Sequence, residues 1–264
     1  MLRQRVITAL LLAPFAVLVI LWIPHAITSL VLALLVLAGA WEWAAFAGSV
    51  STAGRFLYTA AVAIVIAGLW IAGASHPRFD TVLYVALIWW LIALFWVAFF
   101  PNRVNRVAAI AAGFLVLVPA WLALVRLHEQ APQLVLFLVL LVVAADVGAY
   151  FGGRQFGRHK LAPRVSPGKT WEGVVGGLVA AAAMTACAAI WLKISAPSFV
   201  AICIVVVMAS IVGDLTESLF KRHVGLKDSG SLLPGHGGVL DRVDSVTAAA
   251  PVFLFGLERL GLLS

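Results

Sequence analysis

Long apolar runs follow one another along almost the whole chain, separated by short segments that contain Pro or Gly. A helix that crosses a bilayer needs about 20 mostly apolar residues, and these runs reach that length. In total 64% of the 264 residues are hydrophobic and 11% are charged, whereas about half of the residues of a soluble domain are apolar. The runs are too long for the strands of a membrane barrel. The chain is therefore predicted to be an all-α, polytopic integral membrane protein.

The positions of the runs predict a single transmembrane domain over residues 1–264, with no room for a separate soluble domain. Nine spans are expected, at residues 6–23, 26–46, 55–74, 81–100, 107–127, 133–152, 172–194, 198–221 and 246–263. Residues 1–130 carry few polar side chains and are predicted to form a scaffold. Residues 131–264 hold the two longer connections, 153–171 and 222–245, and are predicted to carry the chemistry.

The distribution of Lys and Arg predicts how the chain is oriented in the membrane. If the N-terminus lies in the cytoplasm, 14 of the 18 cations fall in cytoplasmic segments. The four on the opposite side are Arg78, Arg126, Lys193 and Arg259. This asymmetry follows the positive-inside rule and places both long loops in the cytoplasm. It also accounts for the net charge of +7 without a nucleic acid as partner.

The stretch from Asp214 to Ser245 holds five of the 11 acidic residues and four of the 18 cations. An ionised side chain near the bilayer centre costs at least ~2.5–3.5 kcal/mol, so such a concentration needs compensation. Asp214, Glu217, Ser218 and Lys221 are spaced so that they share one face of a helix. Because one lysine cannot neutralise two carboxylates, this face is predicted to bind something else.

A glycine-rich turn and two aspartates complete this stretch. Gly237 and Gly238 would allow backbone N–H groups to approach an anion closely. Asp241 and Asp244 lie three apart at the start of the last helix, and carboxylates suit Mg²⁺ better than zinc. His236 lacks the spacing of a metal pair, and is expected to hydrogen-bond a phosphate or to structure the loop.

The earlier loop carries a second, smaller concentration of polar residues between Asp146 and Glu172. Its Gly168-Lys169-Thr170 is not a phosphate-binding P-loop, because that motif requires Gly where this chain has Pro163. What remains is a cationic, glycine-rich segment at the entry to a helix, where phosphate is favoured. Carboxylates for a divalent metal and cations for phosphates, both facing the cytoplasm within a membrane, indicate phosphoryl or nucleotidyl transfer to a lipid.

The residues also match a known pattern. Ser218-Leu-Phe-Lys221-Arg222, then Lys227-Asp228, then the run from Pro234 to Ser245 that includes His236-Gly237-Gly238 and Asp241-Arg242-Val-Asp244 closely resemble the signature of the CDP-diacylglycerol synthases, or phosphatidate cytidylyltransferases. The segments Asp146…Tyr150…Gly153 and Ser166-Pro-Gly-Lys169-Thr170-Trp-Glu172-Gly173 are also similar to that family. One departure is Gly168, where the family commonly has Lys.

The resemblance implies that CTP and phosphatidic acid react to give CDP-diacylglycerol and pyrophosphate. It implies a requirement for Mg²⁺, a two-metal centre that includes K⁺, and a homodimer. Asp214 and Asp241 would be the principal metal carboxylates, supported by Asp244 and Asp146. Asp214, Asp241, Lys221 and Arg222 are the expected catalytic residues. The expected substrate-binding residues are Ser166, Lys169, Thr170, Ser218, Lys227, His236, Gly237, Gly238 and Arg242.

Two other functions are alternatives to this one. A CTP-dependent kinase of a polyprenol or related lipid would transfer the γ-phosphate instead of the nucleotidyl group. An ion-coupled transporter predicts acids near the midplane in two repeated halves, and this chain shows neither. Glu42, between two tryptophans, is expected to lie in the membrane interface, and Glu172 is expected either to cap its helix or to bind metal.

Overall fold

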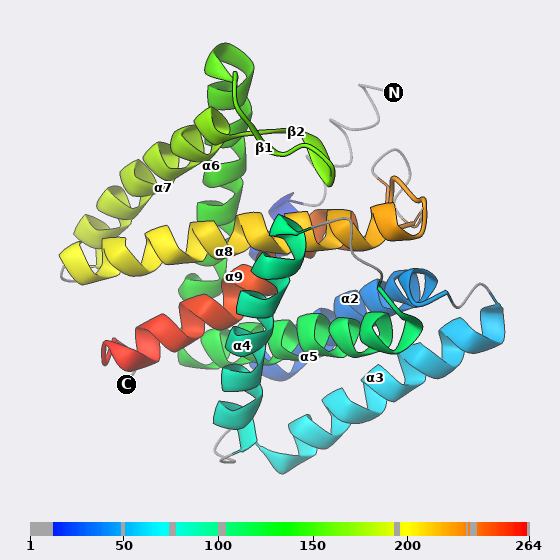
Figure 1. The fold of residues 1–264 in the computed structure, drawn as a ribbon. Helices are drawn as coiled ribbons and strands as arrows, with labels where there is room; N and C mark the ends of the chain where they lie inside the picture. Colours follow the sequence, from blue (N-terminus) through cyan, green and yellow to red (C-terminus); the bar gives the residue numbers. More distant parts are fainter. Residues whose placement is uncertain are drawn as a thin grey trace.

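The computed structural model describes residues 13–48, 51–73, 78–99, 104–192, 196–230, 232 and 237–262. Apart from a helical segment at Ala13–Trp22, the helices are α2 (His25–Phe46), α3 (Thr52–Ala72), α4 (Arg78–Ala98), α5 (Arg106–Gln130), α6 (Pro132–Phe156), α7 (Trp171–Leu192), α8 (Ala196–His223) and α9 (Leu240–Arg259). Two short strands, β1 (Lys160–Ala162) and β2 (Ser166–Thr170), form an antiparallel hairpin between α6 and α7 (Figure 1).

The all-α membrane fold is confirmed. Among the described residues, seven helices (α2 to α8) are long and apolar enough to cross a membrane. The first predicted span is described only at Ala13–Trp22. The ninth, α9, carries both charged and apolar residues and is largely covered by its neighbours. Large apolar side chains such as Phe56, Ile64 and Ile71 of α3 are exposed on the outside, where a bilayer would cover them.

The two predicted loops are shorter than expected. Helix α6 continues to Phe156 and β2 ends at Thr170, so the 153–171 segment is mostly helix and hairpin. Helix α8 continues to His223 and α9 already begins at Leu240, so the second connection is 224–239. Gly153 was expected in the loop but lies inside α6, where a Cβ on it would lie 3.0 Å from Thr170 Oγ1.

Helices α6 and α7 pack with their backbones almost in contact, and Figure 1 shows the pair beside the hairpin. A Cβ on Gly148 would lie 2.5 Å from the carbonyl oxygen of Gly176, and a Cβ on Gly176 would lie 2.5 Å from that of Gly148. Small residues permit this close approach between membrane helices. The packing matters for the site because α6 carries Asp146 and β2, which leads into α7, carries Lys169.

The core is formed around α5, α8 and α9. Helix α8 packs along α9, and α9 packs on α5. Trp43 of α2 donates from its indole Nε1 to the carbonyl oxygen of Ala109 at 2.9 Å, and its ring lies 5.0 Å from that of Phe220 in α8. These contacts fix the C-terminal part of α2 against the C-terminal part of α8.

We predict that Gly148→Ala destabilises the protein, because the added methyl group collides with the backbone of α7 and not with a flexible side chain. Overpacking of this kind costs about 1–3 kcal/mol. The measurement is the thermal unfolding midpoint of the purified protein in detergent. Gly68→Ala in α3 is the matched control, since its Cβ meets no described atom within 4 Å. A Gly148→Ala midpoint equal to that of the control would contradict the packing argument.

Candidate functional site

An ion pair joins the two polar regions that lie far apart in the sequence. Lys169 Nζ in β2 lies 2.6 Å from Asp214 Oδ2 in α8, and both side chains remain partly exposed. Ser218 Oγ donates to the other carboxylate oxygen of Asp214 at 3.3 Å. Arg222 Nε donates to the carbonyl oxygen of Val165 at 3.4 Å, which holds the hairpin turn against α8. The hairpin therefore lies against α8, and the two polar regions of the sequence meet.

A second ion pair, more deeply buried, joins α8 to α9. Lys221 Nζ lies 2.6 Å from Asp241 Oδ1 and 3.2 Å from Glu217 Oε1. The other oxygen of Asp241, Oδ2, accepts hydrogen bonds from the backbone N–H groups of Ser229 at 3.0 Å and Gly238 at 2.9 Å. Burial would raise the pKa of Asp241, but the hydrogen bonds from Lys221, Gly238 and Ser229 hold it below its usual value.

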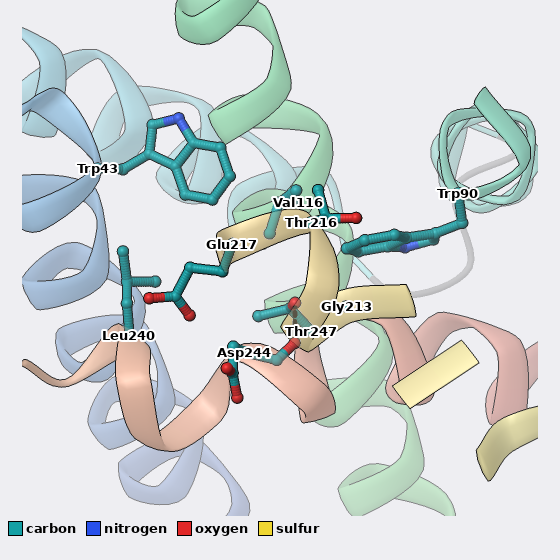
Figure 2. A pocket seen from close by; sticks show the side chains of 9 residues that line it. All are labelled: Trp43, Trp90, Val116, Gly213, Thr216, Glu217, Leu240, Asp244 and Thr247. Carbon is teal, nitrogen blue, oxygen red and sulfur yellow. Dashed lines mark hydrogen bonds between the residues drawn. The ribbon is translucent and has the colours of Figure 1, made fainter. Parts of the chain in front are cut away.

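Two further carboxylates, those of Asp244 and Asp146, lie near these ion pairs, and Glu217 already belongs to the second pair. Glu217 and Asp244 both line a narrow pocket whose other walls include Trp43 and Leu240 (Figure 2). Glu217 is buried, and neither of its oxygens accepts a hydrogen bond from the described residues, although Lys221 lies within ion-pair distance. The charge of Asp214 acts on both Asp244 and Asp146. Negative charge is thus concentrated around Asp214.

The carboxylates fit a hard cation by their chemistry. Asp146, Asp214 and Asp244 offer only oxygen atoms, which Mg²⁺ prefers, and their mutual repulsion would be relieved by a bound cation. Within the described ranges, no group of three or more His, Cys, Asp or Glu is already gathered as a metal cage. Mg²⁺ usually keeps several waters and substrate phosphate oxygens, so it does not need such a cage.

The hydroxyl and glycine residues predicted to bind substrate have structural contacts in the protein. Thr170 Oγ1 accepts a hydrogen bond from the Gly173 N–H at 3.1 Å and so caps α7. Gly237 has a positive φ of 83°, and a Cβ there would lie 2.7 Å from Asp241 Oδ2. Gly238 is buried and donates to Asp241.

The remaining predicted residues lie at the edge of the site or outside the described part of the chain. Lys227 and Arg242 are exposed, while Ser166 is half-buried at the start of β2. His236 lies outside the described residues. Glu172 faces the hairpin: its Oε1 lies 2.6 Å from His159 Nδ1, and both carboxylate oxygens accept from the His159 backbone N–H.

The structure adds two residues that the sequence did not assign to the site, Glu42 and Ser229. Glu42 was expected in the membrane interface, but only 2% of it is exposed. Its carboxylate oxygens accept from the backbone N–H groups of Val239 and Leu240, and from Ser229 Oγ at 3.0 Å. The available signal was an acid within an apolar span, which is usually functional.

Comparisons with known proteins show the family of the chain. Residues 3–259 match the model of the cytidylyltransferase family. A phosphatidate cytidylyltransferase of Pseudomonas aeruginosa is 46% identical over 96% of this chain and 96% of its own. That of Haemophilus influenzae is 37% identical over 97% of this chain and 98% of its own. That of Brucella melitensis is 52% identical over 46% of each chain. The resemblance noted in the sequence is confirmed, and the chain belongs to the cytidylyltransferase family.

Proposed function

We propose that this protein transfers the cytidylyl group of CTP to phosphatidic acid, giving CDP-diacylglycerol and pyrophosphate. The observation that carries the proposal is the Lys169–Asp214 ion pair. It brings the cationic hairpin to the carboxylates of α8 and α9, so that one site offers charges both for a metal and for phosphates. The name of the relatives in Pseudomonas aeruginosa and Haemophilus influenzae, phosphatidate cytidylyltransferase, supports the same reaction.

The chemistry requires no nucleophile from the protein. An oxygen of the phosphatidate phosphate attacks the α-phosphorus of CTP, a new P–O bond forms, and the bond to the β-phosphate oxygen breaks. Pyrophosphate leaves with the electrons of that bond. Lys169 and Arg222, with Arg242 and Lys227 on the exposed rim, are placed to offset the negative charge of the phosphates.

The carboxylates divide into two groups in this proposal. Asp214, Asp244 and Asp146 would hold Mg²⁺, which supplies charge neutralisation on the phosphate oxygens when bound. Asp241 was expected to be a principal metal ligand, but its oxygens are engaged by Lys221 and two backbone N–H groups. We assign it to holding Lys221, Ser229 and Gly238 in place. A second cation, K⁺, is part of the proposal on the basis of the resemblance.

The position of the site in the membrane is also part of the proposal. The positive-inside distribution favours a cytoplasmic site, in the inner membrane if the source is bacterial like the relatives. CTP would enter from water, and phosphatidic acid would enter sideways from the bilayer. A homodimer stays a prediction from the resemblance.

The position of the label transferred from CTP distinguishes the proposed reaction from that of a lipid kinase. Purified protein is incubated with phosphatidic acid and CTP labelled at either the α- or the γ-phosphate. We expect the α-label to appear in the lipid, because the cytidylyl group is transferred, and the γ-label to appear in pyrophosphate. Lipid labelled from the γ-phosphate would identify a kinase and contradict the proposal.

We expect Asp214→Asn and Asp241→Asn each to lower turnover by at least about 10²-fold, the scale of losing a group that stabilises transition-state charge. Asp214→Asn removes a metal carboxylate and the partner of Lys169. Asp241→Asn removes the charge that pairs with Lys221. The rate of CDP-diacylglycerol formation is measured on monodisperse protein. Asp80→Asn is the control, since it removes an exposed carboxylate that pairs with Arg126 away from the site. Wild-type turnover by Asp214→Asn would remove the metal assignment.

Removal of divalent metal should abolish turnover, since three neighbouring carboxylates and the CTP phosphates would then lack a neutralising cation. The protein is treated with a chelator, and CDP-diacylglycerol formation is followed as Mg²⁺ and K⁺ are returned separately and together. Mg²⁺ is expected to restore turnover, and K⁺ to increase it further. Full turnover in the chelator would show that the reaction needs no divalent cation.

A further inference from the structure

The strongest unassigned feature is Glu42, an acid of the N-terminal half whose carboxylate contacts Ser229, Val239 and Leu240 beside the site. It is near the C-terminal end of α2, between Trp41 and Trp43, and is almost fully buried. Trp43 packs against Phe46 and against Phe220 of α8, so the backbone around Glu42 is held firmly. No residue of the first five spans was expected to contribute to the chemistry.

The carboxylate of Glu42 caps α9 from a different helix. Its Oε1 accepts from the N–H of Val239 at 3.0 Å, and its Oε2 accepts from the N–H of Leu240 at 2.9 Å. The first N–H groups of a helix lack partners within the helix and carry positive partial charge. The residue at the N-cap position, Val239, has no side-chain cap hydrogen bond of its own. Glu42 therefore accepts the hydrogen bonds that a capping side chain of α9 itself would otherwise accept.

Two glycines show that the connecting loop is shaped around this carboxylate. A Cβ on Gly230 would lie 2.5 Å from Glu42 Oε1, and a Cβ on Gly238 would lie 2.5 Å from Glu42 Oε2. Gly230 and Gly238 therefore lie directly against the carboxylate, and a larger residue at either position would collide with it. This is a reason for glycine at these positions that does not depend on phosphate binding.

Ser229 connects Glu42 to the active-site ion pair. Its Oγ donates to Glu42 Oε2 at 3.0 Å, while its backbone N–H donates to Asp241 Oδ2 at 3.0 Å. Gly238 also donates to Asp241. The loop is thus held between Glu42 on one side and the Asp241–Lys221 pair on the other.

We infer that Glu42 is a positioning residue for cytidylyl transfer: it holds Ser229 and the start of α9 so that Asp241 keeps Lys221 in place. The inference rests on the proposed function. Glu42 acts through Asp241 and the loop and does not itself touch a reacting atom. Its loss should therefore slow the chemical step more than it weakens substrate binding, because small displacements of catalytic groups act mainly on the transition state.

The test substitution is Glu42→Gln, which keeps the size and shape of the side chain. Both carboxylate oxygens of Glu42 accept hydrogen bonds from backbone N–H groups. The amide of Gln has only one acceptor oxygen, so its NH₂ group must face one of these N–H donors. The matched control is Glu258→Gln in α9, which removes a carboxylate that pairs with Arg126 outside the site. Ser229→Ala and the double variant Glu42→Gln/Ser229→Ala complete the set.

Each full-length variant is purified in detergent, and kcat and KM for CTP and phosphatidic acid are measured per folded, monodisperse molecule. We expect Glu42→Gln to lower kcat on the order of 10²-fold, the scale reported for misplaced catalytic groups, with both KM values nearly unchanged. Ser229→Ala should lower kcat less, because one of the three hydrogen bonds is lost. The double variant should be no slower than Glu42→Gln alone, since the Ser229 hydroxyl acts only through its hydrogen bond to Glu42. Glu258→Gln should keep the wild-type kcat.

The results separate this inference from the proposed function. Wild-type protein that forms no CDP-diacylglycerol would overturn the proposed function. If the wild-type protein forms CDP-diacylglycerol and Glu42→Gln has the same kcat, only the role of Glu42 is overturned. Additive losses of kcat in the double variant would also overturn that role. If Glu42→Gln does not yield folded protein, Ser229→Ala decides: a wild-type kcat overturns the inference, and a lower kcat at an unchanged melting temperature supports it.

Discussion

A charge placed inside an apolar helix bundle must have a partner, and two Lys–Asp ion pairs meet this requirement in the protein. Helix α8 contributes one member of each pair. Asp214 pairs outward with Lys169 of the hairpin, and Lys221 pairs inward with Asp241 of α9. An isolated ion in such surroundings would be costly, so the partners are held together strongly. The relative positions of the hairpin, α8 and α9 depend on these two contacts.

The same constraint explains the unusual surroundings of α9. This helix begins in the interior, where its first N–H groups cannot be satisfied by water. Glu42 of α2 accepts from two of them, and Asp241 accepts from the loop that precedes them. The sequence divides into an apolar scaffold half and a polar half, but the contacts around α9 come from both halves. Glu42, a residue of the apolar half, accepts hydrogen bonds from Ser229 and from the start of α9.

Much of the site could be predicted because its signals are local. Charges stand out in a chain that is 64% hydrophobic, and helical spacing alone indicates that Glu217 and Lys221 are neighbours on α8. The meeting of the two polar regions followed from the positive-inside rule, which places both at one membrane face. Local patterns did not predict which helix backbones would meet. Gly148 and Gly152 were placed correctly within a span, but only the structure shows that the backbone of α7 lies against them.

By itself the sequence determined the all-α membrane fold, the approximate spans, the family and the set of polar residues from which the site is built. These follow from hydrophobic run length, charge distribution and motif spacing, all of which can be read within one segment at a time. Only the tertiary structure decided which charges pair, that Asp241 is engaged by Lys221 and two backbone N–H groups, and that Glu42 lies beneath the loop. Those contacts join residues up to 198 positions apart. They depend on how helices pack, and no pattern within a single segment encodes that packing.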